Sequence, residues 1–249
     1  MYKKIVAVYF SATGNTETYI KACAKSTGLP VEFHNVLSPK AETKIKCQKE
    51  DLLLLGAPDY SGRIPDLARK RFQNLRGQGT DAVLLVTFGN RAIDDALLEM
   101  AGLVKQNSFT VIGGAGLVGK HTFGEIATDR PSSLDLSEAQ KFMQAVLQKE
   151  NKAEVKMPGN FPYKEASTKG KWHPSTKENC IHCGHCEREC PAGAIAPDHK
   201  TINENCISCF HCISVCPVQA KEMQGEAYVA FCESLNERLK APQKNEFYL

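Results

Sequence analysis

Eight of the 11 cysteines gather in two runs that share one spacing. Each run reads C-x2-C-x2-C-x3-C-P; the first begins at Cys180 and the second at Cys206. Thiolates are soft ligands that suit iron–sulfur clusters, and a [4Fe-4S] cluster takes four of them. Closely spaced cysteines can surround one cluster in a tight loop, so the last ligand must approach from another segment. The pattern therefore indicates iron–sulfur electron-transfer chemistry.

Two other uses of these cysteines fit the pattern less well. Structural zinc usually takes its ligands from separated C-x2-C pairs, which the third cysteine and the closing Cys-Pro do not match. Disulfide bonds need an oxidising compartment, and the start of the chain, Met1-Tyr-Lys-Lys-Ile, does not read as a signal peptide. We therefore expect two [4Fe-4S] clusters in a cytoplasmic protein.

The double run resembles the bacterial two-cluster ferredoxins, in which the last cysteine of each run ligates the other cluster. The resemblance implies low reduction potentials and crossed ligand sets. Cluster 1 would be held by Cys180, Cys183, Cys186 and Cys216, and cluster 2 by Cys206, Cys209, Cys212 and Cys190. Three histidines lie between these ligands, and we expect them to be ordinary loop residues: His182, His185 and His211.

A second candidate site follows the apolar run at residues 4–10, which is typical of a strand buried on both faces. The run ends in a short loop of Ser11, Ala12, Thr13, Gly14, Asn15 and Thr16. Backbone N–H groups and hydroxyls at the start of a helix bind phosphate. The loop has neither a Walker A lysine nor G-x-G-x-x-G, so ATP and NAD are not expected here.

This loop resembles the FMN phosphate loop of flavodoxins, (S/T)-x-T-G-x-T, and two later loops fall where a flavodoxin holds the isoalloxazine ring. The resemblance assigns to FMN the first loop together with Pro58, Asp59, Tyr60, Ser61, Gly62, Phe88, Gly89, Asn90 and Arg91. Tyr60 could stack on the ring. Arg91 could stabilise a reduced flavin or be a solvated surface residue. Many flavodoxins carry tyrosine where Phe88 stands. The sequence therefore does not decide which side chain covers that face of the isoalloxazine ring.

Alternating strand and helix patterns over residues 1–150 must position these loops. We predict strands at 4–10, 31–36, 51–56, 81–87 and from 109, and helices at 16–27, 64–75, 91–106 and from a cap at Asp135 or Ser137 to about 149. This order gives a parallel sheet with right-handed crossovers. The resemblance implies an α/β fold, a flavodoxin-like doubly wound five-stranded sheet in the order 2-1-3-4-5, plus a small α+β ferredoxin domain.

The chain is expected to have four parts. They are a flavodoxin-like FMN domain at 1–150, a linker or cover segment at 151–174, a ferredoxin domain at 175–222, and a C-terminal helix and tail at 223–249. Phe161, Tyr163 and Trp172 are the expected anchors of the second part. Apolar residues at helical spacing over 226–240 should dock the last part. As a whole, the chain resembles the flavodoxin–ferredoxin fusions of anaerobic prokaryotes.

The remaining candidates are isolated side chains. Cys23 and Cys232 lie on apolar stripes and are expected in the core, whereas Cys47 lies in a polar stretch and is expected at the surface. His121 follows the fifth strand and could contact FMN, contact a partner or shape a turn.

The net charge of +3 carries little weight, because two clusters and a flavin phosphate would together outweigh it. There is no basic stripe, so no nucleic-acid or membrane partner is expected. We predict an electron-transfer protein with redox partner proteins; the oligomeric state is not predicted. Two alternatives stay open: an FMN-dependent reductase of a quinone, nitro compound or nicotinamide, and a cluster-bearing sensor or interaction module with an empty flavodoxin fold.

Overall fold

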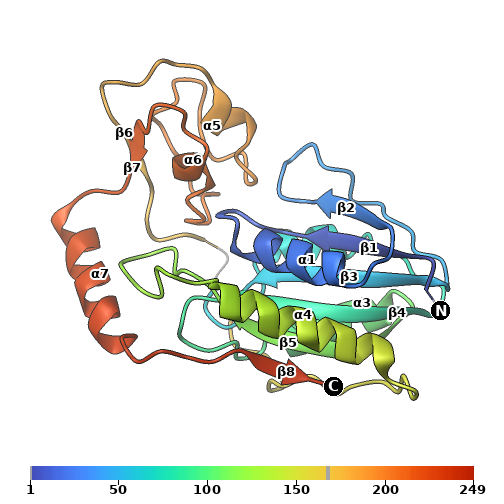
Figure 1. Ribbon diagram of the computed structural model, residues 1–249. Coiled ribbons are helices and arrows are strands. Elements are labelled where there is room, and N and C mark those ends of the chain that lie inside the picture. The colour runs from blue at the N-terminus through green and yellow to red at the C-terminus, as the bar shows by residue number, and fades with distance from the viewer. Residues whose placement is uncertain (1, 167–168) are drawn as a thin grey trace.

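A computed structural model describes residues 2–166 and 169–249. Its centre is a sheet in the order β2-β1-β3-β4-β5-β8, in which all pairs but the last are parallel (Figure 1). The strands are β1 (Lys4–Tyr9), β2 (Val31–Asn35), β3 (Asp51–Pro58), β4 (Thr80–Phe88), β5 (Phe109–Val118) and β8 (Glu246–Tyr248). The predicted doubly wound α/β fold and the order 2-1-3-4-5 are confirmed.

Helices cover both faces of the sheet, as continuous apolar strands require. The helices of the sheet domain are α1 (Asn15–Ser26), α2 (Asp66–Phe72), α3 (Ala96–Gln106) and α4 (Ser133–Gln148). Alternate residues of β1 divide between two buried clusters: Ile5 packs with Ile20 and Phe142 on one face, and Val6 packs with Phe72 on the other. Because β1 to β5 are parallel, these five strands end at the same edge of the sheet, where the loops that follow them gather.

The sheet has one more strand than predicted, because the C-terminal tail adds β8 antiparallel to β5. Strand β8 is only three residues long, which is too short for the alternation of apolar and polar residues to be recognised in the sequence. Phe247 packs on Phe142 with ring centroids 5.3 Å apart. The side chain of Asn245 accepts a hydrogen bond from the backbone of Val118. The tail thereby covers the edge of β5 and closes the sheet on that side.

The starts of α3 and α4 depart most from the predicted helix starts. Helix α3 begins at Ala96 rather than Arg91, since Asp94 has a left-handed φ of 38° that breaks the helical turn. Helix α4 is capped by Ser132, not by Asp135 or Ser137. Ser132 and Asp135 form a capping box. Asp135, one of the two predicted caps, is therefore the third residue of α4.

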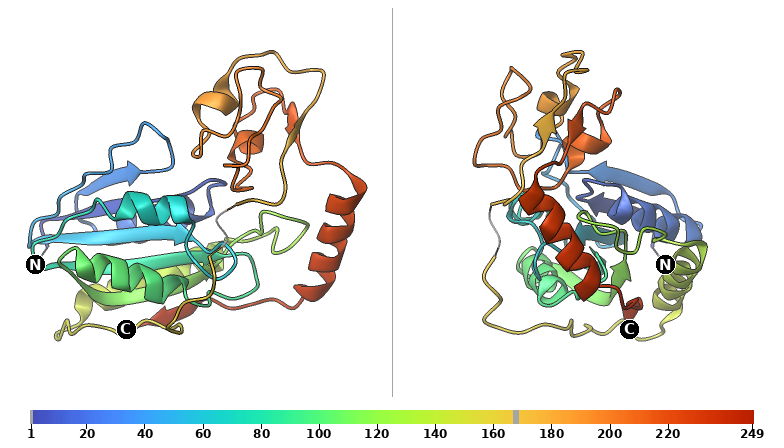
Figure 2. Two further views of the ribbon diagram at one scale, coloured as in Figure 1. Left: turned by 180° about the vertical axis from the view of Figure 1, so that it is seen from behind. Right: turned by 90° about the vertical axis from the view of Figure 1, so that its left-hand side faces the viewer.

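Residues 151–166 run along the flank of the sheet domain (Figure 2) and are held partly by anchors that were not predicted. Met157 is buried, and the Asp95 carboxylate accepts hydrogen bonds from the backbone of Asn160 and Lys164. Tyr163 is a confirmed anchor, lying 4.6 Å from the guanidinium of Arg63. The prediction for Phe161 is wrong, because its side chain is 82% exposed.

The cysteine runs form a small domain with two-fold internal similarity. It contains β6 (Ser175–Thr176), α5 (His185–Arg188), α6 (His211–Ser214) and β7 (Lys221–Glu222). Equivalent positions share left-handed backbone, with φ of 70° at Gly184 and 57° at Phe210. Cys190 and Cys216 each accept a hydrogen bond from the N–H four residues later, at 3.3 and 3.1 Å. The repeated spacing has produced a repeated fold.

This small domain sits on the loop edge of the sheet (Figures 1 and 2). The imidazole of His211 donates through Nδ1 to the carbonyl of Ala12 at 2.7 Å, and Arg71 donates to the carbonyl of Pro191 at 2.9 Å. Helix α7 (Glu226–Arg238) flanks both domains. Its predicted apolar stripe does dock, through an aromatic cluster of Phe123, Trp172, Phe210, Tyr228 and Phe231.

Candidate functional site

A cavity of about 740 Å³ lies at the carboxyl ends of β1, β3 and β4, under the small domain. This is the edge at which open α/β sheets bind ligands, and the volume suits a cofactor-sized molecule. Most residues assigned to FMN line it: Ser11, Ala12, Thr13, Asn15, Thr16, Pro58, Asp59, Tyr60, Ser61, Phe88, Gly89 and Arg91. The fold thus brings three separate loops to one space.

The first loop presents free donors to this cavity. Gly14 precedes α1 with φ of 94°, a conformation that glycine adopts without strain. Within the described part of the chain, the backbone N–H groups of residues 12–16 donate no hydrogen bond. Ser11 accepts from the N–H of Glu17, and the hydroxyls of Thr16 and Thr87 lie 2.7 Å apart. Unpaired donors at a helix N-terminus fit a phosphate group.

The second and third loops meet at an ion pair. Arg91 contacts the carboxylate of Asp94 at 2.6 Å and that of Asp59 at 3.4 Å. Asp59 also accepts from the N–H of Gly62 at 2.6 Å. Burial raises the pKa of Asp59 to about 7, although Arg91 and the Gly62 N–H act in the opposite direction. Arg91 is therefore paired beside the cavity and lies outside the helix in which it was predicted.

We expect Asp59 to make stability depend on pH. Its ordinary pKa is 3.8, so the unfolded chain has already lost this proton at a pH where the folded chain, with a pKa of about 7, still holds it. The contribution to stability is therefore present at low pH and is lost as pH rises through about 7. The difference in unfolding free energy between wild type and Asp59→Asn should fall by about 2 kcal/mol from pH 5.5 to 8, measured by urea unfolding. A flat difference would contradict the raised pKa.

Three residues assigned to FMN do not line the cavity. Gly14 and Gly62 shape their loops through backbone contacts. Asn90 is buried, donates to the carbonyls of Leu239 and Ala241, and accepts from the N–H of Gln243. Asn90 thus holds the C-terminal segment in the place that leads into β8.

The aromatic cover of the cavity comes from segments distant in sequence. Phe123, Trp172 and Phe231 line it, together with His121, while Phe88 is almost wholly buried. His121 shapes a turn, since its Nδ1 lies 2.9 Å from the backbone nitrogen and oxygen of Phe123. The sequence indicated parts of this cover, through the helical stripe containing Phe231, the expected anchor Trp172 and the candidate His121. The rest depends on how α7 and residues 169–172 fold over the sheet edge.

Set 1 denotes the four thiols that the resemblance assigns to cluster 1, and set 2 denotes the four that it assigns to cluster 2. One small cavity of the cysteine-rich domain is lined by Cys180, Cys183, Cys186 and Cys216. Cys216 comes from the other run, and its sulfur also accepts the N–H of Ala220. A cavity walled by four thiols, with amide donors aimed at a sulfur, has the chemistry to hold an anionic iron–sulfur cluster.

In set 2, Cys190 lies near the other three thiols. Burial raises the pKa of Cys206, Cys209 and Cys212, and the nearby Cys190 raises each of them further. Cys186 of set 1 acts on Cys212 in the same way, so the two sets adjoin. Burial raises the pKa of Tyr60 in the large cavity, with a further contribution from Cys209. Cys209 also belongs to the buried cluster against which Tyr60 packs, and the adjoining Ser208 lines the large cavity, so set 2 lies on the side of the small domain that faces the cavity.

Three cysteines lie outside the two runs, and their burial differs from the predictions in two cases. Cys232, which was predicted in the core, is only half-buried on α7. Cys23 is buried, as predicted. The prediction for Cys47 is wrong: its side chain is fully buried, and burial raises the pKa of its thiol to about 12. Leu75 and Ile45 belong to the same buried cluster, so the polar residues around Cys47 in sequence face outward while its thiol faces in.

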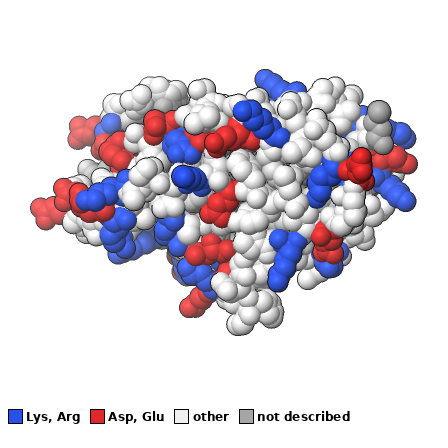
Figure 3. Space-filling model, turned by 60° about the horizontal axis from the view of Figure 1, so that its bottom comes forward, with Lys and Arg blue, Asp and Glu red and all other residues white. Residues whose placement is uncertain are grey.

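The described residues hold neither a compact single-metal site nor a membrane-spanning helix. No three His, Cys, Asp or Glu side chains there converge on a point that would hold one metal ion. No helix of residues 2–166 and 169–249 combines the length and apolar character needed to cross a membrane. On the face shown in Figure 3, lysine and arginine side chains are interspersed with aspartate and glutamate.

Comparison with known proteins identifies one domain by sequence. Residues 175–217 match the family model described as the 4Fe-4S dicluster domain. A search of curated proteins finds no match.

Among solved structures, a flavodoxin from the domain Archaea aligns with 57% of this chain and 95% of its own, at 16% identity and a TM-score of 0.42. Flavodoxin 2 from Bacillus cereus aligns over 58% and 98%, at 13% identity and a TM-score of 0.43. Rubredoxin oxygen:oxidoreductase from Desulfovibrio gigas aligns over 59% of this chain and 37% of its own, at 16% identity and a TM-score of 0.40.

The strand order and the cysteine domain lead to one description. A parallel sheet in the order 2-1-3-4-5 is the flavodoxin topology. The chain thus joins a flavodoxin-like α/β domain to a 4Fe-4S dicluster domain at residues 175–217, the combination found in a flavodoxin–ferredoxin fusion.

Proposed function

We propose that this chain is an electron-transfer protein that holds FMN in the large cavity and two [4Fe-4S] clusters on thiol sets 1 and 2. The observation that carries the proposal is the order of the sites. Cys186 of set 1 acts electrostatically on Cys212 of set 2, and Cys209 of set 2 belongs to the buried cluster against which Tyr60 of the cavity packs. When bound, the clusters supply one-electron chemistry and FMN supplies one- or two-electron chemistry.

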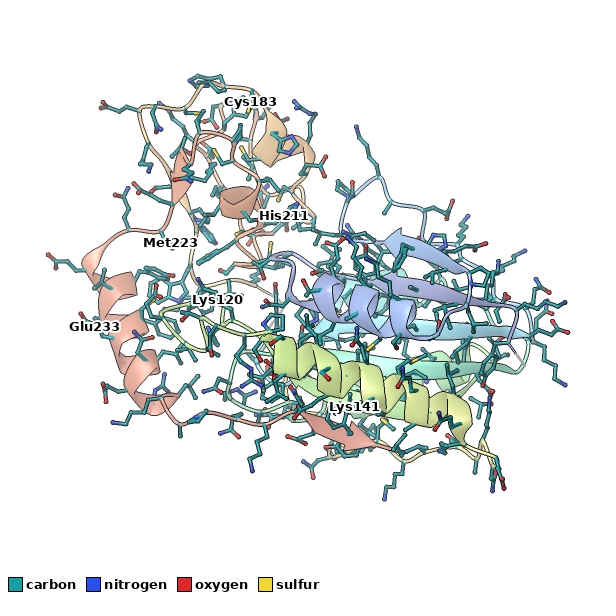
Figure 4. The ribbon with its side chains drawn as sticks, in the orientation of Figure 1. Lys120, Lys141, Cys183, His211, Met223 and Glu233 are labelled. Carbon is teal, nitrogen blue, oxygen red and sulfur yellow. The ribbon has the colours of Figure 1, made fainter. Side chains whose placement is uncertain are left out.

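The exposure of the cysteines indicates which thiol set lies at the surface and which lies next to the cavity. Figure 4 shows Cys183 at the end of the small domain away from the sheet and His211 at the end facing it. Cys183 is exposed, and the neighbouring Ile181 side chain is 60% exposed. Cys209 is only 8% exposed. A partner protein would therefore meet set 1 at the surface, whereas set 2 is screened from water and faces the cavity.

The contacts between the domains hold the sites in place. The bond from His211 to the carbonyl of Ala12 ties the short helix after Cys209 to the phosphate loop. The bond from Arg71 to the carbonyl of Pro191 ties the segment after Cys190 to α2. These anchors favour transfer within one chain, because they fix set 2 against the cavity wall rather than letting the small domain swing.

An anaerobic reductive titration of the purified holoprotein tests this function. Two clusters and FMN should together take up about four electrons, with flavin bands resolved over the broad cluster absorption. An uptake of about two electrons without flavin bands, even after FMN is added, would contradict the proposal and favour an interaction module. Steady turnover of a quinone, nitro compound or nicotinamide well above that of free FMN would favour a reductase instead.

A further inference from the structure

Lys221 is a buried cation in the cysteine-rich domain. Its side chain belongs to β7 and the residue is only 3% exposed. The ammonium donates to the hydroxyl of Thr176 at 2.7 Å and to the carbonyl of His199 at 2.6 Å. Both acceptors are neutral, and no carboxylate of the described residues lies within ion-pair distance of it. A buried charge without a counter-charge is strongly unfavourable.

The thiols near Lys221 would supply the missing negative charge once they hold a cluster. Lys221 lines the small cavity walled by the four thiols of set 1. Its ammonium also lies close enough to Cys186 of set 1, and to Cys206 and Cys212 of set 2, to act on each of them electrostatically. One ammonium therefore acts on both sets, at the place where they adjoin.

The backbone fixes this position from two sides. Lys221 pairs with Thr176 in the two-stranded sheet of β6 and β7, which places the side chain toward the thiols. His199 has a left-handed φ of 58°, and its carbonyl accepts both the ammonium and the Thr176 hydroxyl. The ammonium is thus held by a built set of acceptors rather than by chance packing.

We propose that Lys221 is the shared internal counter-cation of the two clusters and raises the reduction potential of both. The inference rests on the proposed function only in requiring that both clusters are present. A cluster with four thiolates is anionic, and an added electron increases its negative charge by one. A fixed cation in a low-dielectric interior stabilises the more negative state, so each cluster binds its electron more tightly.

The test is Lys221→Gln in the full-length holoprotein, with both cluster potentials measured by titration followed by electron paramagnetic resonance. Each cluster should bind its electron about tenfold more weakly, which is about 59 mV toward lower potential for a one-electron couple. The matched control is Lys177→Gln, which removes a solvent-exposed charge from the same small domain. Its effect should be small because water and salt screen an exposed charge.

The outcomes separate this inference from the proposed function. Unchanged potentials in a Lys221→Gln variant that keeps both clusters, or a shift in only one of them, would overturn the shared role. If Lys221→Gln does not assemble both clusters, Lys221→Arg decides: restored clusters with near wild-type potentials support the charge, and failure to restore them rejects it. A wild type with fewer than two clusters refutes the proposed function before any variant is compared, whereas absent FMN leaves this test intact.

Discussion

Replacing Cys190 by alanine should abolish the cluster that Cys206, Cys209 and Cys212 hold, although Cys190 belongs to the other run in sequence. The physical reason is proximity, since Cys190 acts electrostatically on all three of those thiols. A [4Fe-4S] cluster that loses one of four thiolates loses a ligand for one iron corner. Iron content should fall from about eight to about four atoms per chain, measured by chemical iron analysis.

Two double variants show whether the ligands are crossed. With crossed sets, Cys190→Ala combined with Cys209→Ala damages one cluster only, so about four irons remain. Cys190→Ala combined with Cys183→Ala damages both clusters, and almost no iron remains. Ligand sets that follow the two runs in sequence predict the opposite pair of results. Each double variant therefore serves as the matched control of the other, since both lack two thiols.

Loss of this cluster should also isolate the flavin from the surface. Cys190→Ala removes the cluster that would lie beside Tyr60, whereas Cys216→Ala removes the one nearer the surface. A reductant too large to enter the cavity should then reduce the flavin slowly in the first variant. Equal flavin reduction rates in wild type and Cys190→Ala, followed by stopped flow, would contradict the order of sites.

A negative charge at Thr13 should weaken FMN binding by about a hundredfold. Thr13 is exposed and lines the cavity at the phosphate loop, so Thr13→Asp changes charge without disturbing the core. The FMN phosphate carries up to two negative charges, and repulsion at this range costs about 3 kcal/mol. Titration of flavin-depleted protein with FMN, followed by quenching of flavin fluorescence, gives the dissociation constants.

Two controls separate the charge from the shape of the loop. Thr13→Asn is close in size to Thr13→Asp and neutral, so FMN should bind to it nearly as to wild type. Riboflavin lacks the phosphate, so its binding should be the same in all three proteins. If Thr13→Asp weakened FMN and riboflavin equally, the phosphate would lie elsewhere and the assignment of residues 11–16 would be wrong.

The sequence by itself determined the local chemistry and the order of the elements. Continuous apolar strands and intervening amphipathic helices predict a doubly wound sheet, because each element must bury its apolar surface against a neighbour. The repeated cysteine spacing predicts the dicluster domain, since ligand spacing within one loop is a local property. The phosphate loop is local too, and its free N–H groups follow from the start of α1.

Only the tertiary structure decided how the parts meet. The packing of Cys209 near Tyr60, the pairing of β8 with β5 and the aromatic cover by Trp172 join segments that no sequence period links. Cys47 was mispredicted because its neighbours are polar, whereas burial depends on what the fold places against the thiol. Lys221 belongs to no sequence motif. Its proposed role depends on the thiols that two distant segments bring close to its ammonium. Long-range contacts of this kind depend on complementary surfaces, which a one-dimensional pattern does not record.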